Sequence, residues 1–285
     1  MRGLFTYGKN IFLINKRLLL FLLATLALLL SGSLVNNNVN LEQIFVIITA
    51  GFCGVVLFYD VGWIDYKSSL IVQFKQFLSY ERKVFFSIVL LLLIPYALTV
   101  LPPLSFFTFA ITAFLAFMYS HPIKINDQII RLKNIFLVKN LMIGFAWGAL
   151  VLIGAGSMED NTTVWLTLFA MVQVFVGSMI RDVSDVNVDP ERGIRSIPVV
   201  LGIEPSINLM HLINGTSFGI AIFSGWSFNL MILFGIIVGW RAITLMMLKG
   251  NIHSPFWVQT ANLMTCCLFF FILLIQHLYG IHSWS

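Results

Sequence analysis

Three aspartates in one short segment are the residues whose spacing most clearly indicates chemistry. Asp182, Asp185 and Asp189 stand at positions i, i+3 and i+7. On a helix these positions lie at about 0°, 300° and 340°, so the three carboxylates would share one face. Like charges stacked in this way repel each other unless a cation neutralises them. Because Mg²⁺ is commonly held by a few carboxylates together with substrate phosphates, the pattern predicts a magnesium site.

Two arginines follow these aspartates directly. Arg192 and Arg195 lie just beyond Asp189, and the planar guanidinium group is suited to phosphate oxygens. The alternative is a solvated loop that happens to be acidic. We favour a binding site, since Asp182 closes an apolar stretch and acids at membrane depth are rare without a function.

A weaker acidic pattern ends an earlier apolar stretch. Asp60 stands in the same relative place as Asp182, and Asp65 follows it, about 140° further round a helix. The two share a face only if the helix is broken between them, which Gly62 would allow. The alternative is that Asp65 is solvated or pairs with Lys67. Two such helix-end acids suggest related halves that meet around one polar cavity.

Further polar residues stand where other apolar stretches end or begin. Tyr119 and Ser120 close one stretch, Lys124 and Arg131 follow it, and Asn140 stands at the start of the next. The two bases are placed to meet an anion. An amide inside a membrane helix is costly unless it is hydrogen-bonded, so Asn140 should point inward.

The segments that must position these residues are strongly apolar. Of the 285 residues, 59% are hydrophobic and only 10% are charged, and the mean hydropathy is +0.94. A soluble domain carries about a quarter charged residues, so a soluble enzyme, a disordered chain and a nucleic-acid-binding module are excluded. The three cysteines lie in apolar runs without zinc spacing or a disulfide pattern. The basic N-terminus has no small-residue cleavage site, so we expect no removable signal peptide.

Nine apolar stretches are long enough to cross a bilayer, which takes roughly 20 residues. They cover about 12–34, 41–60, 84–101, 103–120, 136–156, 163–181, 205–224, 227–248 and 258–279. We therefore predict an all-α fold, a polytopic membrane bundle of nine transmembrane helices with a polar cavity that faces the cytoplasm. The chain forms a single membrane-embedded domain, 1–285, in which spans 1–4 and 5–8 could form two related halves followed by span 9.

Basic residues orient these spans, because Lys and Arg concentrate on the cytoplasmic side of a membrane. With nine spans, all 17 Lys and Arg fall at the N-terminus or with the connections after spans 2, 4, 6 and 8. We therefore predict a cytoplasmic N-terminus and a C-terminus outside. The longer connections, about 61–83, 121–135 and 182–204, are then all cytoplasmic, so the active site should lie at that face.

Three sequence motifs fall on this predicted cytoplasmic side. They are Asp182-x-x-Asp185-x-x-x-Asp189 with the trailing Gly193-Ile194-Arg195-Ser196-Ile197-Pro198, Tyr119-Ser120-x-Pro122, and Lys139-Asn140-Leu141. In these motifs and in its nine spans the chain resembles the UbiA-type membrane prenyltransferase superfamily, the relatives of 4-hydroxybenzoate polyprenyltransferase. The resemblance covers nearly the whole chain.

The resemblance implies an Mg²⁺-dependent enzyme that moves an isoprenyl group from a prenyl diphosphate donor to a lipophilic acceptor within the lipid bilayer. The metal ligands that it implies are Asp60, Asp182, Asp185 and Asp189, of which the first three are also the implied catalytic residues. The implied substrate-binding residues are Tyr119, Ser120, Lys124, Arg131, Asn140, Arg192, Arg195 and Lys67. No nucleic-acid partner is expected.

The chain departs from the family in the first aspartate motif. The four fixed positions of the family pattern Asn-Asp-x-x-Asp-x-x-x-Asp align without a gap to Tyr59, Asp60, Trp63 and Lys67, so only Asp60 is retained. Three interpretations stay open: catalysis with altered donor binding, Lys67 in place of a metal cation, or a protein that binds an isoprenoid without turnover. A membrane terpene cyclase, in which the carbocation attacks its own double bond, would carry the same motifs. A transporter fits less well, because no acid lies in the middle of a span.

Overall fold

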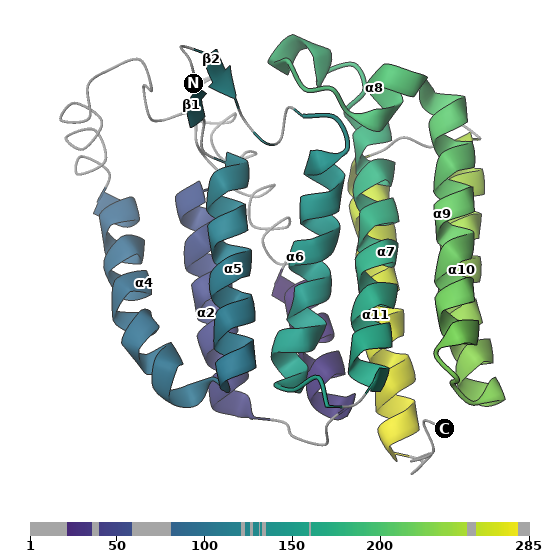
Figure 1. The fold of residues 1–285 in the computed structure, drawn as a ribbon. Helices are drawn as coiled ribbons and strands as arrows, with labels where there is room; N and C mark the ends of the chain where they lie inside the picture. The colour runs from purple at the N-terminus through teal and green to yellow at the C-terminus, as the bar shows by residue number, and fades with distance from the viewer. Residues whose placement is uncertain are drawn as a thin grey trace, which may run out of the picture.

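The computed structural model describes residues 22–35, 40–58, 81–120, 123–125, 128–130, 132, 135–159, 161–249 and 255–278. They form a bundle of helices that run up and down side by side (Figure 1). In chain order the helices are Leu22–Val35, α2 (Leu41–Phe58), α4 (Glu81–Val100), α5 (Pro103–Ser120), α6 (Val138–Ala155), α7 (Asn161–Ser184), the 3₁₀ helix η3 (Pro190–Arg192), α8 (Ile197–Leu201), α9 (Ile203–Phe223), α10 (Phe228–Lys249) and α11 (Pro255–Leu278).

Each predicted span overlaps a helix, although residues 12–21 of the first span and 59–60 of the second lie outside the described residues. Among the residues that the structure describes, five helices are long and apolar enough to cross a membrane, namely α6, α7, α9, α10 and α11 from Trp257 onward. Four shorter apolar segments, Leu22–Val35, Leu41–Gly51, Ser87–Val100 and Pro103–Leu115, fall within the first four predicted spans. Large apolar side chains such as Leu91, Leu212 and Phe223 are exposed on the outside of the bundle, as expected for a surface that faces lipid. The number of membrane crossings and the polar cavity stay predictions.

Two connections contain structure that the sequence did not predict. Between α5 and α6, β1 (Ile123–Ile125) and β2 (Gln128–Ile130) form an antiparallel hairpin with Ile123 opposite Ile130. The regular secondary structure of the described residues is therefore helical except for these two strands. The segment 182–204 is no open loop, because α7 continues to Ser184 and is followed by η3 and α8. Gly193 ends η3 with a φ of 67°, a backbone conformation that favours glycine.

The ends of the helices bring the predicted motif regions together. The hairpin, the start of α6, the end of α7, η3 and α8 all lie at one end of the bundle (Figure 1). The connections between α4 and α5, α6 and α7, and α9 and α10 lie at the opposite end. The end that carries the motifs is called the motif end below.

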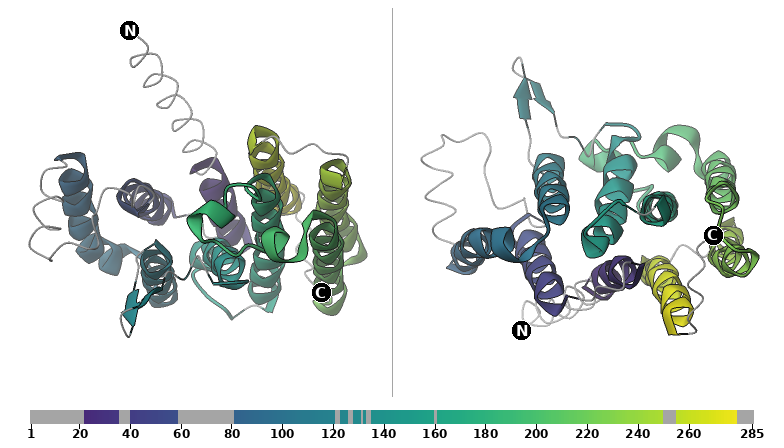
Figure 2. Two further views of the ribbon diagram at one scale, coloured as in Figure 1. Left: turned by 90° about the horizontal axis from the view of Figure 1, so that it is seen from above. Right: turned by 60° about the horizontal axis from the view of Figure 1, so that its bottom comes forward.

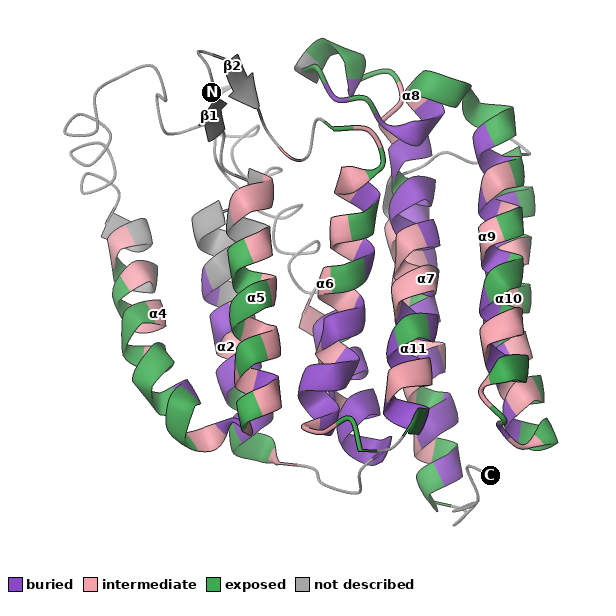
Figure 3. Ribbon diagram, in the orientation of Figure 1, coloured by how far each residue is buried: buried purple, intermediate pink, exposed green. Residues whose placement is uncertain are grey.

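Helix α7 lies in the interior of the bundle and packs against α6, α9 and α11 (Figure 2). Buried residues are concentrated along α7 and in the second half of α6 (Figure 3). An aromatic cluster joins α7, α10 and α11, in which the ring centroids of Phe169 and Phe234 are 4.7 Å apart and Phe269 stacks nearby. The aspartate segment at the end of α7 is thus held by a helix that is packed on several sides.

Glycines let α6 approach its neighbours closely. A Cβ atom on Gly144 would lie 2.9 Å from the carbonyl oxygen of Met171 in α7, and a Cβ atom on Gly148 would collide with the Met171 side chain. Towards the other end, Gly154 faces the carbonyl oxygen of Leu29 in the first helix. Small residues allow this backbone approach between membrane helices. The first turn of α6 is therefore held directly beside the last turns of α7.

One charged residue is buried inside a membrane helix. Arg241 falls within the predicted span 227–248, although the orientation argument assigns it to the bases of the connection after that span, and it lies inside α10 with 1% exposure. Its guanidinium group finds polar partners in the packed interior, on α7 and α11, and these contacts between distant segments are not visible in the local sequence.

Candidate functional site

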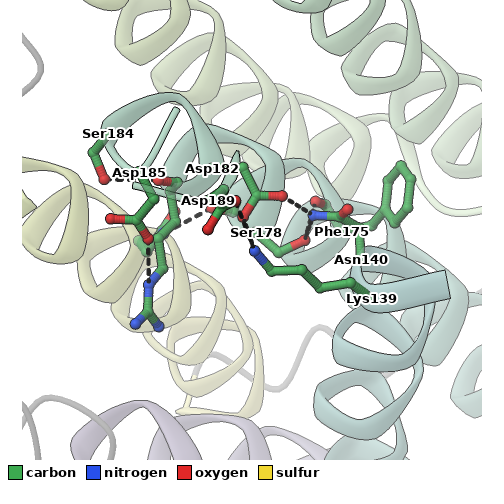
Figure 4. A network of polar contacts seen from close by, with 11 residues as sticks. Lys139, Asn140, Phe175, Ser178, Asp182, Ser184, Asp185 and Asp189 are labelled. Atoms are coloured by element: carbon green, nitrogen blue, oxygen red, sulfur yellow. Dashed lines mark hydrogen bonds and ion pairs between the residues drawn. The ribbon is translucent and has the colours of Figure 1, made fainter. Parts of the chain in front are cut away.

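A lysine held between two aspartates forms the centre of the candidate site (Figure 4). Lys139 Nζ lies 2.6 Å from Asp182 Oδ1 and 3.5 Å from Asp189 Oδ2. The side chains of Lys139, Asp182 and Asp189 are 13%, 1% and 4% exposed. Hydrogen bonds between charged groups are among the strongest in proteins. Within the described residues, the positive charge that balances this pair of buried carboxylates therefore comes from α6.

Asn140 completes the surroundings of Asp182. Its Nδ2 donates to Asp182 Oδ2 at 2.8 Å and to Ser178 Oγ at 2.9 Å. Both carboxylate oxygens of Asp182 therefore accept a hydrogen bond from α6. Ser178 Oγ donates in turn to the carbonyl oxygen of Phe175 at 2.7 Å. Asn140 is buried, as its amide predicts, and its Oδ1 has no hydrogen-bond partner among the described residues.

Asp185 lies apart from the other two aspartates. Its Oδ2 is 3.9 Å from Arg181 Nε, and both side chains are substantially exposed. Because α7 ends at Ser184, the three aspartates do not continue one regular helical face; the backbone N–H of Asp189 donates to the carbonyl oxygen of Asp185 at 2.9 Å inside a turn. Asp182 and Asp189 consequently meet at one cation, while the Asp185 side chain points toward a different group (Figure 4).

Two other predicted site residues have described side chains. Tyr119, the next-to-last residue of α5, lies within electrostatic range of the Lys139 ammonium group, so the end of α5 lies near the candidate site. Arg195 is exposed in the stretch between η3 and α8. It stands at the motif end, near the aspartate segment in sequence.

The remaining predicted site residues are only partly described or lie outside the described residues. Ser120 ends α5, Lys124 is paired with Ile129 in the hairpin and Arg192 ends η3, but their side chains are outside the description. The residues Asp60, Lys67 and Arg131 lie outside it altogether. The first aspartate motif therefore stays a prediction from the sequence.

Lys139 and Ser178 contact the site but were not among its predicted residues. A signal for Lys139 was present, since a lysine in the first turn of an apolar membrane helix requires a partner. Ser178 precedes Asp182 by one helical turn, and this places both side chains on the same face of α7. Neither signal identifies the partner, because Lys139 is 43 residues away from Asp182 in sequence.

The donor atoms at this position fit magnesium in their chemistry. Mg²⁺ binds oxygen ligands and usually takes one or two carboxylates together with substrate phosphates and water. Asp182 and Asp189 already approach a single positive group, Lys139 Nζ. In the part of the chain that the structure describes, no group of three His, Cys, Asp or Glu side chains is arranged to hold a metal. Magnesium would therefore need ligands beyond these two carboxylates.

Comparison with protein families gives a match that covers more than half of the chain. The sequence model of the UbiA prenyltransferase family matches residues 75–255, which include the hairpin, the site and all of α6 to α10. None of the curated proteins matches the chain at a significant level.

Solved structures with a similar fold cover most of the chain. A UbiA homolog from Archaeoglobus fulgidus bound to DMAPP and Mg²⁺ is similar with a TM-score of 0.65 and 16% sequence identity, over 91% of this chain and 97% of that chain. A structure of digeranylgeranylglyceryl phosphate synthase is similar with a TM-score of 0.60 and 14% identity, over 93% and 98%. The apo UbiA homolog from Aeropyrum pernix K1 gives 0.60 and 12%, over 90% and 98%. At these identities the likeness shows the fold.

Proposed function

The chain belongs to the UbiA prenyltransferase family, and we propose that it transfers an isoprenyl group from a prenyl diphosphate to a lipophilic acceptor in the membrane, with Mg²⁺ as cofactor. The observation that carries this proposal is the pair of buried carboxylates, Asp182 and Asp189, at the end of a helix that is apolar enough to cross a membrane. The A. fulgidus homologs in complex with DMAPP or GPP and Mg²⁺ support the choice of donor and metal.

The proposed metal ligands are Asp182, Asp185 and Asp189, joined by Asp60. When bound, Mg²⁺ would neutralise the diphosphate and stabilise it as the carbon–oxygen bond breaks. The chain itself prepares this position, because Asn140 fixes Asp182 through Oδ2 and the nearly complete burial of Asp182 strengthens its interaction with any cation.

The basic and polar residues that the sequence motifs single out are proposed to bind the diphosphate group of the donor. They are Lys124, Arg131, Arg192, Arg195 and Lys67, together with Tyr119, Ser120 and Asn140. Arginine is well suited to this role because its planar group binds phosphate oxygens in pairs. The isoprenyl tail and the acceptor are apolar, and the exposed apolar surface of the bundle supports their entry from the bilayer.

Release of diphosphate by the purified protein in detergent tests the proposal. We expect release that requires both Mg²⁺ and a prenyl diphosphate, with a prenylated product when a lipophilic acceptor is present. Asp182→Asn should lower this release, whereas Glu204→Gln should not, since Glu204 is an exposed acid that pairs with the exposed Lys249 at 3.2 Å.

The same assay separates the alternative functions. A cyclised hydrocarbon formed without an acceptor would indicate a terpene cyclase. Donor binding without any diphosphate release would indicate a non-catalytic isoprenoid-binding protein, the second candidate, which the loss of acids at Trp63 and Lys67 in the first motif favours.

A further inference from the structure

The carboxylate oxygens that a metal would need are already engaged by α6. Lys139 Nζ contacts one oxygen of Asp182 at 2.6 Å and one of Asp189 at 3.5 Å. The second oxygen of Asp182 accepts from Asn140 Nδ2 at 2.8 Å. A metal ion that binds Asp182 Oδ1 and Asp189 Oδ2 together must therefore take the position of the lysine ammonium group.

The charges make simultaneous binding unfavourable. Asp182 and Asp189 together carry two negative charges, and Lys139 supplies one positive charge beside them. A divalent cation within a few ångströms of the ammonium group would be repelled by it, and the low exposure of all three side chains strengthens this repulsion. Metal and lysine are thus mutually exclusive at these oxygens.

The lysine is able to leave. Its charge is carried on a flexible chain of four carbons, and the side chain keeps 13% exposure although both of its carboxylate partners are almost completely buried. Lys139 extends from the second residue of α6, while Asp182 and Asp189 belong to α7 and the turn after it. Movement of the ammonium group therefore breaks an ion pair that links two helices and does not require either helix to unfold.

We propose that Lys139 is an intramolecular counter-ion of the Asp182–Asp189 motif and competes with Mg²⁺ for Asp182 and Asp189. Metal enters when the ammonium group withdraws, so the metal-free protein keeps its buried carboxylates neutralised. The inference rests on the proposed function for the identity of the metal. Beyond that function, Lys139 lowers the affinity of the protein for Mg²⁺ when no prenyl donor is bound.

Magnesium titration without any prenyl donor tests this competition. We expect Lys139→Met, which keeps a similar side-chain volume without the charge, to bind Mg²⁺ at least about tenfold more tightly than the unaltered protein in calorimetry. Lys139→Arg should keep the competition, because it keeps the positive charge. Lys249→Met is the matched control, since Lys249 is exposed and pairs with Glu204 outside the site, and it should leave the Mg²⁺ affinity unchanged.

Thermal unfolding gives a second measurement. With a chelator, Lys139→Met should unfold at a lower temperature than the unaltered protein, because two buried carboxylates lose their counter-ion. Added Mg²⁺ should then raise its unfolding temperature more than that of the unaltered protein, since a ligand stabilises the state that binds it. If Lys139→Met is too unstable to purify, Lys139→Gln is measured in the same way.

The results distinguish the inference from the function on which it rests. Mg²⁺ affinity in the neutral variants that is equal to or weaker than that of the unaltered protein would overturn the competition, as would a loss of thermal stability that Mg²⁺ does not restore. Mg²⁺-dependent diphosphate release by the unaltered protein would still support the proposed function in that case. If Lys139→Met binds Mg²⁺ more tightly but the unaltered protein releases no diphosphate, the competition is supported and the proposed enzyme activity is contradicted.

Discussion

At the residue scale, Asp182 and Asp185 have equal places in the sequence motif and different surroundings in the fold. Asp182 is buried and contacts Lys139 and Asn140, whereas Asp185 is partly exposed beside Arg181. Asp182→Asn should therefore lower stability by about 3–5 kcal/mol, since it removes one partner of a buried ion pair. Asp185→Asn should leave the free energy of unfolding within about 0.5 kcal/mol. Thermal unfolding of the two purified variants measures this difference.

Turnover should respond differently from stability. If both carboxylates bind the metal, each substitution should lower diphosphate release about 10²-fold, comparable to the removal of a main electrostatic stabiliser of a transition state. The same protein preparations serve for both measurements. If Asp185→Asn releases diphosphate at a near-native rate, Asp185 is not a metal ligand. If both variants lose the same free energy of unfolding, the prediction based on their different burial is wrong.

The sequence predicts part of this site for a physical reason. The regular spacing of Asp182 and Asp189 indicates a shared side of the chain, and both residues contact Lys139 in the fold. The same spacing included Asp185, but the α-helix ends at Ser184 and the next side chain turns elsewhere. Lys139 was missed as a site residue because its ion pairs span 43 and 50 residues, a separation at which helical periodicity carries no information.

At the element scale, the contact between α6 and α7 depends on glycine. Gly144→Ala places a methyl group 2.9 Å from the carbonyl oxygen of Met171 and 3.1 Å from Phe175 Cβ. Because backbone atoms cannot rotate away, we expect a loss of about 1–3 kcal/mol in stability. Lys139 and Asn140 are about one turn earlier in α6, so the substitution should also weaken Mg²⁺ binding.

Unfolding temperature and metal titration of Gly144→Ala check this expectation. Gly215→Ala is the matched control, because a Cβ atom at Gly215 in α9 would meet nothing within 4 Å. The control should unfold at the same or a slightly higher temperature, since alanine is the better helix former. Equal behaviour of the two variants would show that close contact at Gly144 does not hold α6 in place.

A buried arginine joins α10 and α11 to α7. Arg241 Nη1 donates to Asn262 Oδ1 at 2.6 Å, Arg241 Nη2 donates to the carbonyl oxygen of Gln173 at 3.3 Å, and Asn262 Nδ2 donates to the carbonyl oxygen of Gly177 at 3.0 Å. Asn262→Leu would leave the buried guanidinium group without one acceptor. We expect a loss of about 3 kcal/mol, because a buried charged donor would be left without one of its acceptors.

A second substitution separates the charge from the packing. Arg241→Met combined with Asn262→Leu removes both polar partners, and apolar replacement of a buried polar pair is often close to neutral. The double variant should therefore unfold at a higher temperature than Asn262→Leu alone. If the stability losses of Arg241→Met and Asn262→Leu add up to the loss of the double variant in thermal unfolding, the two residues are not coupled.

The helices were predicted well, and the short elements were not. The predicted span 163–181 and the helix Asn161–Ser184 agree within a few residues at each end, because a long apolar run followed by polar residues defines a membrane helix almost alone. The hairpin β1–β2 and the helices η3 and α8 have only three to five residues each. Segments of that length contain too few positions for a period to be recognised.

At the scale of the whole molecule, the distribution of apolar side chains explains why the bundle belongs in a membrane. Leu91 on α4 and both Leu212 and Phe223 on α9 are exposed, and in water such exposed apolar surface would favour aggregation. In a bilayer the lipid tails solvate these apolar side chains, and the helices pack against each other through glycines and buried polar groups. The composition predicts this environment, while the pairing of helices comes only from the fold.

The orientation of the bundle is the remaining prediction at this scale. The hairpin and η3 lie at the motif end, and the turn between α6 and α7 lies at the opposite end (Figure 1). The Lys and Arg residues of the connections belong to the motif end in the nine-span arrangement, which predicts that this end faces the cytoplasm. Single cysteines at Lys124 and Arg192 should then be reached from the cytoplasmic side, and one at Glu159 from outside.

Labelling with a membrane-impermeant maleimide checks this arrangement. Intact cells should label Glu159→Cys and not the other two, and inverted membrane vesicles should label Lys124→Cys and Arg192→Cys and not Glu159→Cys. The unaltered chain is the control, since Cys53 and Cys266 are buried and Cys267 lies in α11. The reverse pattern would place the site outside the cell. If Lys124→Cys and Arg192→Cys are labelled from opposite sides, α6 and α7 do not both cross the bilayer. The predicted nine-span arrangement and its orientation would then both be wrong.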